Sequence, residues 1–358
     1  MKKISMISTI LGMKDVEKGS QDMKKKNMTD TTVYKRIGRV GLLEYKGLNK
    51  FDWLVNAFST REGGVSEGQF ATMNFSISMG DDPGKVAENF RIFGNTIGVK
   101  PDDMVYADQR HTDHVMVAGA EHKGMGVTRA RDFSGGSGFS GKDSEGFIAG
   151  VDGLVTDEPG VCLVTSYADC VPLYFVDPVH RAIGLTHSGW RGTVAKIGTR
   201  TIELMHEKYG SKPKDMVCAI GPCIGKECYE VSEDVAEAFK AAYTKEQYER
   251  ICEPKELQGC ANFSTDDEEK QPENCLCRDE KKAVDADNNA LHGSLRETCG
   301  KYLINLPQAN YEQFIEIGVA PGNIHMPDLC TACNHELLHS HRATGGKRGG
   351  NCAFLMIK

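Results

Sequence analysis

Two short apolar runs separated by a turn constrain this chain more than any other feature. They are Val171–Val176 and Ala182–Leu185, each bordered by small and polar residues. Runs of this kind are typical of buried β-strands. Cys170 comes directly before the first run, and His187 follows the second run within the segment THSGWRG. The ends of neighbouring strands can bring such side chains together, so the sequence predicts a reactive site there.

Two kinds of site fit this pair of residues. A thiolate nucleophile needs a base beside it, which Cys170 and His187 can supply. A metal site needs further ligands, and His111 offers one from the polar loop DQRHTDH. One thiolate and two imidazoles make three ligands of a tetrahedral zinc or copper site and leave the fourth position open. Taken singly, each of these residues is also compatible with an ordinary structural role, and the grouping of all three favours a metal.

Composition narrows the class of protein. The chain has 358 residues, of which 40% are hydrophobic and 26% are charged, as expected for a soluble globular protein. The net charge of −7 argues against a nucleic-acid partner, which would require a clustered excess of Lys and Arg. The 13 cysteines are scattered and follow no clear secretory signal, so we expect reduced thiols in the cytoplasm. No apolar run approaches the roughly 18 residues of a membrane span.

Strand-like and helix-like segments alternate along the chain. We expect a disordered tail over residues 1–35 and ordered structure from about Gly41. Asp82-Pro83 opens a helix whose apolar face ends at Gly98, and Thr193 caps a second helix that Gly210 ends. The other expected elements are a helix from Ser232, a helix over Ser294–Tyr302, a helix over Pro307–Ile317 and a strand over Cys352–Ile357. Alternation without a repeat predicts an α/β or α+β layered architecture.

Two segments interrupt this pattern. Residues 119–150 are rich in Gly and Ser, and we interpret them as a flexible loop. Within this loop, Gly136–Asp143 resembles a phosphate-binding loop, but Asp143 replaces the Ser or Thr that would bind magnesium. Residues 252–290 are acidic and poor in large apolar side chains, so we interpret them as an inserted loop. The cysteines of this insertion are too irregularly spaced to indicate a metal site.

A second group of potential ligands lies near residue 335. Cys330, Cys333, His335, His339 and His341 superficially resemble a zinc finger. The single residue between Cys333 and His335 is far too short for the hairpin and helix of a finger, so a structural zinc is disfavoured. The basic, Gly-rich segment that follows contains Arg342, Lys347 and Arg348, and it either borders an anionic ligand or is simply solvated.

Several motifs, in order, resemble those of one family. QRHTDHV, ADCVP, HSGWRG, GPCIGKECYEV and LCT followed by SHR occur in the order of the laccase-domain family, and AFSTREGGVSEGQFATMNFS with GDDPGKVAENF resembles its opening signature. This family was once called multicopper polyphenol oxidoreductases and is now described largely as purine nucleoside phosphorylases. The likeness covers roughly residues 40–250 and 295–358.

The resemblance implies a fold, a cofactor and a reaction. The fold is a single catalytic domain over residues 36–358, with a mixed β-sheet flanked by helices. The metal, usually zinc with copper as an alternative, is held by His111, Cys170 and His187, and Arg61 binds substrate or phosphate. The reaction is phosphorolysis of adenosine, inosine, guanosine or methylthioadenosine by inorganic phosphate, with adenosine deamination also ascribed to the family.

Two other activities remain open at this stage. One is an amide hydrolase that edits a peptidoglycan precursor with Cys170 as nucleophile and His187 as base. The other is a polyphenol oxidase, the family's older description. A multicopper oxidase needs many paired histidines, whereas His339-Ser-His341 is the only such pair in the chain.

Overall fold

A computed structural model describes residues 31–76, 78–129, 148–255 and 300–358. The chain divides into two compact units, a main unit of Met1–Gly225 and Leu306–Lys358 and a small unit of Lys226–Asn305. The first strand, β1, begins at Thr32. Ordered structure therefore begins earlier than predicted, both for the tail expected to extend to residue 35 and for the start expected near Gly41. All six residues of β1 pair with the next strand.

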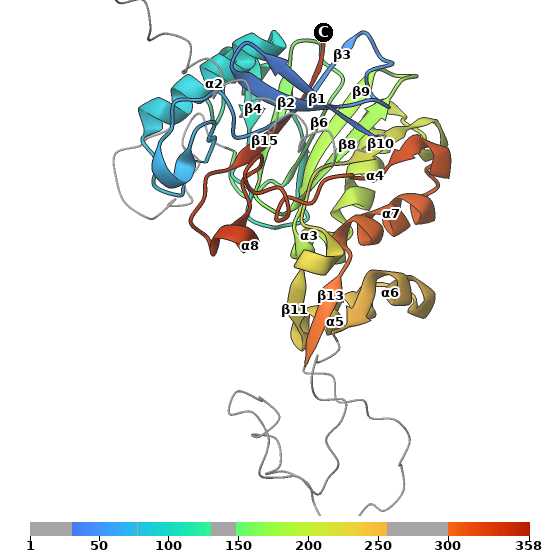
Figure 1. The fold of residues 1–358 in the computed structure, drawn as a ribbon. Helices are drawn as coiled ribbons and strands as arrows, with labels where there is room; N and C mark the ends of the chain where they lie inside the picture. The colour runs from blue at the N-terminus through green and yellow to red at the C-terminus, as the bar shows by residue number, and fades with distance from the viewer. Residues whose placement is uncertain (1–30, 77, 130–147, 256–299) are drawn as a thin grey trace, which may run out of the picture. The chain divides into compact units, whose positions relative to one another are not determined.

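The main unit contains two six-stranded sheets (Figure 1). The first has the order β1-β2-β3-β15-β7-β4 and the second the order β14-β10-β8-β9-β6-β5. Both are mixed, because β4 runs parallel to β7 in the first sheet and β5 runs parallel to β6 in the second. The strands of the first sheet are β1 Thr32–Ile37, β2 Val40–Tyr45, β3 Leu54–Ser59, β4 Met104–Tyr106, β7 Cys162–Tyr167 and β15 Asn351–Ile357. Those of the second are β5 Val115–Val117, β6 Gly153–Thr156, β8 Val171–Asp177, β9 Ala182–Ser188, β10 Val217–Ile220 and β14 Ile324–His325.

The two sheets pack face to face. One apolar cluster contains Leu43 and Phe58 from the first sheet together with Tyr174 and Leu185 from the second. The rings of Tyr45 and Tyr174 lie 4.8 Å apart across this interface. The hydroxyl of Tyr174 donates a hydrogen bond to the carbonyl of Ala57 at 3.2 Å, so this polar atom is satisfied inside the core. The strands of the hairpin β8–β9 are buried along their whole length, as expected for their apolar runs, and the polar residues at their ends are buried as well.

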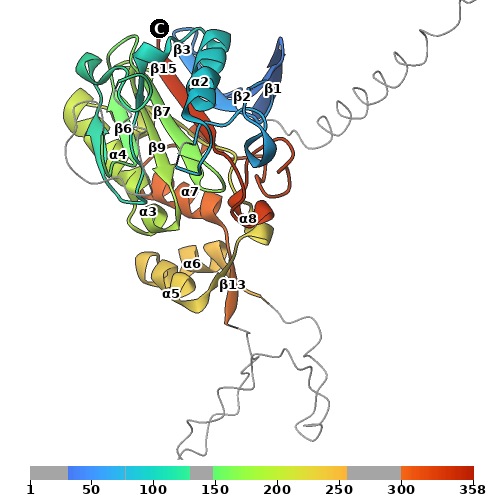
Figure 2. The same cartoon turned by 90° about the vertical axis from the view of Figure 1, so that its left-hand side faces the viewer.

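Helices cover the outer faces of both sheets (Figures 1 and 2). Helix α2, Pro83–Ile97, packs Phe90 and Phe93 against Phe354 of the first sheet. Its ends match the sequence prediction: the Asp82 carboxylate accepts hydrogen bonds from the first turn, and Gly98 closes the helix with φ 75°. On the second sheet, Phe314 of α7 meets Phe175 at 5.3 Å. The remaining helices of the main unit are α3 Trp190–Val194, α4 Ile197–Tyr209, α7 Leu306–Ile317 and α8 His341–Thr344.

The segment before α4 differs from the prediction. Thr193 does not cap the long helix but lies buried within the short helix α3. Lys196, with φ 62°, separates α3 from α4, so the chain changes direction before the long helix starts. The Thr193 hydroxyl donates instead to the carbonyl of Gly189 at 3.0 Å. The helix end at Gly210 is as predicted, with φ 74°.

The small unit has a three-stranded sheet of order β11-β13-β12. Its described elements are β11 Glu230–Ser232, α5 Glu233–Ala242, α6 Lys245–Ile251, β12 Cys252–Pro254 and β13 Lys301–Ile304. Helix α5 follows Ser232 as predicted. The predicted helix Ser294–Tyr302 is wrong at its end, because Lys301 and Tyr302 pair in the strand β13. Cys252 likewise belongs to a strand, and residues 256–290 of the predicted insertion lie outside the described residues.

The predicted fold class is confirmed: the protein is a mixed α/β structure with helices flanking mixed sheets. The mixed sheet of the prediction is present as two packed sheets. In the predicted loop 119–150, residues 119–129 include a short 3-10 helix, Ala120–His122, and the phosphate-loop-like segment 136–143 lies outside the described residues. Among the helices that the structure describes, none is long and apolar enough to cross a membrane.

Candidate metal site

Four polar residues lie at one edge of the second sheet because of its strand order. Cys170 precedes β8, His187 lies near the end of β9, Asp152 precedes β6, and His111 lies in the loop before β5. The strands β8, β9, β6 and β5 are consecutive in the sheet. Strand β9 is antiparallel to β8 and β6, and β5 is parallel to β6, so all four positions fall at the same edge.

The three predicted ligands come together at this edge. The sulphur of Cys170 and one ring nitrogen each of His111 and His187 all lie within 4.8 Å of one another. The distance from Cys170 Sγ to His111 Nε2 is 3.7 Å, and the two imidazole rings meet edge to face with centroids 4.9 Å apart. His187 is buried, Cys170 is half-buried and His111 is exposed. The group is therefore anchored in the core on one side and open to solvent on the other.

A glycine permits this close grouping. A Cβ atom on Gly189 would lie 2.6 Å from Cδ2 of His111 and 3.3 Å from the sulphur of Cys170. The first distance is shorter than any ordinary contact between carbon atoms. A side chain at Gly189 would push His111 away from the other two residues, which gives this glycine of the segment HSGWRG a specific structural role.

The carboxylate of Asp152 holds both histidines. Its Oδ1 accepts a hydrogen bond from Nδ1 of His187 at 2.8 Å and from the backbone N–H of His111 at 3.0 Å. The carboxylate is fully buried. Because Nδ1 of His187 is occupied by this bond, its Nε2 is the nitrogen available to a metal. A carboxylate behind a ligating histidine is the usual support of a metal-binding imidazole.

The same carboxylate stabilises an uncommon backbone conformation. His111 has φ 59°, a left-handed value that a residue with a side chain rarely adopts. The backbone N–H groups of Arg110, His111 and Thr112 all donate to the Asp152 carboxylate, at 3.1, 3.0 and 2.8 Å. Three hydrogen bonds to one buried charge offset the conformational strain. The loop is further tied to β7 by the Gln109 side chain, which bonds both the N–H and the carbonyl of Ser166.

Asp169 plays a corresponding role for Cys170. Asp169 has a φ of 90°, so it is the second residue of the site, after His111, with a left-handed backbone conformation. Its carboxylate accepts hydrogen bonds from the hydroxyl of Thr331 at 2.6 Å and from the backbone N–H of Arg342 at 2.7 Å. The two acids thus fix the backbone at both the cysteine and the exposed histidine.

Charges within the group shift its pKa values. Burial lowers the pKa of His187, but the Cys170 charge and the Asp152 hydrogen bond outweigh it and raise this pKa to about 9. Burial raises the pKa of Cys170, but His187 and His111 outweigh it and lower this pKa to about 6. For Asp152, burial is outweighed by the bonds from His187 and Thr112, which hold its pKa well below the usual range. The site therefore favours a thiolate, the form in which cysteine binds metals.

This donor set fits a metal. One thiolate and two imidazoles, with a supporting carboxylate and an open side, match a site with three protein ligands and one free position. Among the described residues, this is the one group of potential ligands that contains histidines.

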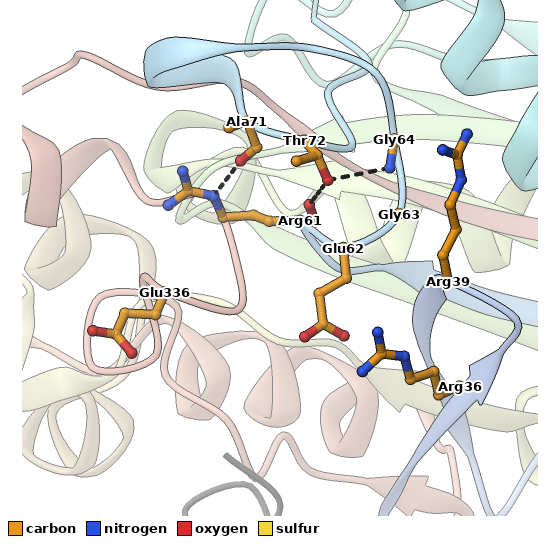
Figure 3. A pocket seen from close by; sticks show the side chains of 9 residues that line it. All are labelled: Arg36, Arg39, Arg61, Glu62, Gly63, Gly64, Ala71, Thr72 and Glu336. Carbon is orange, nitrogen blue, oxygen red and sulfur yellow. Dashed lines mark hydrogen bonds between the residues drawn. The ribbon is translucent and has the colours of Figure 1, made fainter. Parts of the chain in front are cut away.

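Arg61 lies outside the group of three. It lines an open pocket of about 600 Å³ whose lining residues include Arg36, Arg39, Glu62 and Glu336 but none of the three ligands (Figure 3). Its Nε donates to the carbonyl of Ala71 at 3.0 Å and its Nη1 to the carbonyl of His335 at 2.7 Å. These bonds fix the guanidinium and leave Nη2 for another partner.

A chain of hydrogen bonds connects Arg61 to Arg348 through the buried His339. The carbonyl of Arg61 accepts the N–H of Met73, and Nε2 of His339 lies 3.2 Å from the carbonyl of Met73. On the other side of the ring, Nδ1 accepts the N–H of Gly349, whose carbonyl accepts Nη1 of Arg348. Burial and the charges of Arg61 and Arg348 lower the pKa of His339 to about 3. His339 is therefore neutral and belongs to this connection, which agrees with the sequence argument against a zinc site near residue 335.

Arg348 carries an unsatisfied donor. Its Nε is buried and has no hydrogen-bond partner among the described residues. Burial lowers the pKa of Arg348, and the negative charges of Cys170 and Asp169 oppose this effect. Those opposing charges indicate that the guanidinium lies within the electrostatic reach of the candidate metal site. A buried donor without a partner is costly, and an anionic ligand would satisfy it.

Comparisons with known proteins identify the family of this chain. The family model described as multi-copper polyphenol oxidoreductase laccase matches residues 55–265 and 276–358. The chain belongs to this family. It is 29% identical over 316 residues to a purine nucleoside phosphorylase of Bacteroides thetaiotaomicron, covering 88% of this chain and 96% of that one. It is 27% identical to adenosine deaminase RL5 from an unknown prokaryotic organism, over 82% of this chain and 91% of the relative.

A solved structure supports the same assignment. The crystal structure of YlmD from Geobacillus stearothermophilus is 28% identical in sequence, with a TM-score of 0.69, and the match covers 91% of this chain and 99% of that one. The family resemblance inferred from the motifs is therefore confirmed.

The sequence did not single out Asp152 or the carboxylate of Asp169 as parts of the site. Asp152 is one of 50 acidic residues, and its local segment GVDGL carries no ligand spacing. The one available signal is its position directly before a short apolar strand, the same kind of position that drew attention to Cys170. Its role depends on β6 lying between β5 and β9, which no local pattern reveals.

Replacing Asp152 by Asn should weaken metal binding. The amide keeps the shape but loses the charge that receives five donors, so His187 and the His111 loop lose their common anchor. We expect zinc affinity to fall about 10- to 100-fold. Competition with a chromogenic chelator measures the zinc affinity. The control is Asp157→Asn, which changes an exposed acid directly after β6. Equal affinities of the two variants would contradict the role of Asp152.

Alkylation of Cys170 in metal-free protein should follow its lowered pKa. The rate of iodoacetamide labelling should rise as pH passes about 6, whereas an unperturbed cysteine reacts near about 8.5. Added zinc should suppress labelling across this range, because a coordinated sulphur is a poor nucleophile. Mass spectrometry of the Cys170 peptide gives the rate at each pH. A midpoint near the unperturbed value would show that the two histidines do not activate this thiol.

Proposed function

We propose that this protein is a metal-dependent purine nucleoside phosphorylase acting on adenosine, inosine, guanosine or methylthioadenosine. The observation that carries the proposal is the grouping of His111, Cys170 and His187 around a buried carboxylate at one sheet edge. The names of relatives that align over most of the chain support it, as with the purine nucleoside phosphorylase of Bacteroides thetaiotaomicron.

Zinc is the metal we propose for this site, with copper as the alternative. Zinc accepts a mixed set of sulphur and nitrogen ligands in tetrahedral geometry. His111, Cys170 and His187 would hold it, and Asp152 would fix the orientation of His187. A zinc ion held there would supply Lewis-acid chemistry. The same group is too small for a multicopper oxidase, which argues against polyphenol oxidation.

Inorganic phosphate is the second substrate, and two arginines are suited to bind it. Arg61 has an Nη2 that its two backbone contacts leave available, and Arg348 has a buried Nε without a partner. Both guanidiniums lie close enough to His339 to lower its pKa, so they concentrate positive charge in one region. A planar guanidinium binds phosphate oxygens well.

The chemistry requires one bond to form and one to break. A phosphate oxygen bonds to the anomeric carbon of the ribose, and the bond from that carbon to the purine nitrogen breaks. The bonding electrons leave with the purine, which takes up the proton that the attacking phosphate gives up. The arginines bind and orient the phosphate, and oriented reactants account for a large part of such rate enhancements.

Adenosine deamination is a second candidate. The free fourth position implied by the three-residue donor set favours it, because zinc deaminases use this arrangement to attack a base. A relative named adenosine deaminase aligns over most of the chain. Use of Cys170 as the nucleophile of an amide hydrolase is a further alternative, supported by its lowered pKa in the absence of metal.

We also propose a cytoplasmic location and small-molecule substrates without a nucleic-acid or membrane partner. The cysteines are odd in number and scattered along the sequence, which suits a reducing compartment. The net charge of −7 disfavours binding to a phosphate backbone.

Product analysis distinguishes these activities. Zinc-loaded protein is incubated with adenosine in the presence and in the absence of phosphate, and the products are separated by chromatography. Phosphate-dependent release of adenine together with ribose 1-phosphate is the expected result. Inosine formed without phosphate would identify deamination, and the absence of both products would sink the proposal. The His111→Ala variant should lose the activity along with the metal.

Replacing Arg348 by Gln should specifically weaken phosphate binding. Loss of a charged donor to an anion costs about 1.5–3 kcal/mol, which corresponds to a KM for phosphate raised roughly 10- to 100-fold. The KM for the nucleoside should change little. Steady-state kinetics with each substrate varied in turn measures both values, and Lys347→Gln, an exposed neighbour, is the matched control. An effect confined to the nucleoside KM would assign Arg348 a different role.

A further inference from the structure

A pair of cysteines lies close to the candidate site without belonging to it. Cys330 and Cys333 are separated by Thr331 and Ala332, and their sulphur atoms lie within 4.8 Å of each other. The backbone N–H of Asn334 donates to the carbonyl of Cys330 at 3.1 Å, so the segment forms a helical turn that puts residues three apart on one side. Cys333 is exposed and Cys330 is half-buried.

The first contact of this turn leads to Cys170. Between the two cysteines, the Thr331 hydroxyl donates to the carboxylate of Asp169 at 2.6 Å, and the Thr331 N–H donates to the carbonyl of Cys223 at 2.9 Å. Asp169 has the left-handed φ of 90° that sets the backbone direction at Cys170. A shift of Thr331 therefore reaches the residue next to the thiolate through a single hydrogen bond.

The second contact leads to the arginine proposed for phosphate. The turn continues through residues 334–338, and the carbonyl of His335 accepts Nη1 of Arg61 at 2.7 Å. The carbonyl of Leu337 accepts the backbone N–H of Arg61 at 2.9 Å. The one turn thus positions Arg61 and, through Asp169, the backbone at Cys170.

Joining the two sulphurs would deform this turn. A disulfide has an S–S distance of about 2.05 Å and a fixed dihedral angle, and neither cysteine is in one here, so closing the bond moves the two side chains and the Thr331-Ala332 backbone between them. The sulphur of Cys330 also accepts the N–H of Gly225 at 3.1 Å, and this bond would have to change as well. Displacements of about 1 Å at a catalytic site can lower rates by up to about 100-fold.

We propose that Cys330 and Cys333 are an oxidisable dithiol whose reversible disulfide disturbs the site by moving Thr331 and the carbonyls that hold Arg61. The disulfide itself is independent of the reaction, whereas its effect on turnover rests on the proposed phosphorylase function. The oxidant is a low-molecular-weight disulfide such as oxidised glutathione.

The exchange balances in two steps. The exposed Cys333 thiolate attacks one sulphur of oxidised glutathione, which forms a mixed disulfide and releases one glutathione thiolate. The Cys330 thiolate then attacks the sulphur of Cys333 and releases the second glutathione. The protein loses two protons and two electrons, and one glutathione disulfide is reduced to two thiols. Dithiothreitol reverses the change.

The test compares reduced and oxidised protein. Wild type is treated with oxidised glutathione, and peptide mapping should find a Cys330–Cys333 disulfide with a mass about 2 Da lower than the dithiol. Hydrogen–deuterium exchange should rise in the peptides that contain Asp169 and Arg61. The kcat/KM for phosphorolysis should fall about tenfold and recover with dithiothreitol.

The Cys333→Ser variant is the matched control. It keeps the reduced geometry and should show wild-type activity before oxidant, with no loss afterwards. Equal inactivation of this variant would assign the effect to another thiol, and linkage of either cysteine to a different residue would overturn the pairing. A mapped disulfide with unchanged exchange at Asp169 and Arg61 would overturn the coupling. If oxidation alters hydrogen–deuterium exchange at Asp169 and Arg61 but the protein shows no phosphorolysis, the proposed dithiol is supported and the proposed function is rejected.

Discussion

The buried carboxylate of Asp152 is the interaction on which the site depends. It receives the ring N–H of His187, three consecutive backbone N–H groups and the hydroxyl of Thr112. A buried charge is tolerated only when it is fully hydrogen-bonded. Here the donors come from His187 of β9 and from the loop before β5. The same contacts that solvate the charge also define the positions of two imidazoles. The hydrogen bonds that stabilise this edge of the sheet are therefore the same ones that set the geometry of the candidate ligand group.

Two left-handed residues show how the fold keeps this site in place. His111 and Asp169 have positive φ values, and each is held by hydrogen bonds from outside its own segment. Such backbone conformations persist where the surroundings over-determine them, and they concentrate at functional sites. In this protein one is the proposed ligand His111 and the other directly precedes the proposed ligand Cys170. The loop before β5 and the entry into β8 are thereby fixed to the rigid second sheet.

Much of this arrangement could be predicted from sequence, and the remainder depends on pairing between distant segments. The strands around Cys170 and His187 follow from apolar runs, and α2 follows from Asp82, Pro83 and Gly98, because these signals are local. The division into two packed sheets and the place of Asp152 between two strands are set by long-range pairing, which leaves no local mark. Thr193 misled the helix prediction because its hydroxyl is bonded inside a separate short helix.

The position of β15 has a consequence for how the chain is made. This strand lies between β3 and β7 in the first sheet, although its Asn351 contacts Tyr167 across 184 residues of sequence. During synthesis, β3 and β7 leave the ribosome long before the strand that joins them, so their facing edges stay unpaired. Unpaired edges are where chains associate wrongly. These two edges stay open until β15 emerges, and the interval grows with every residue inserted between β7 and β15.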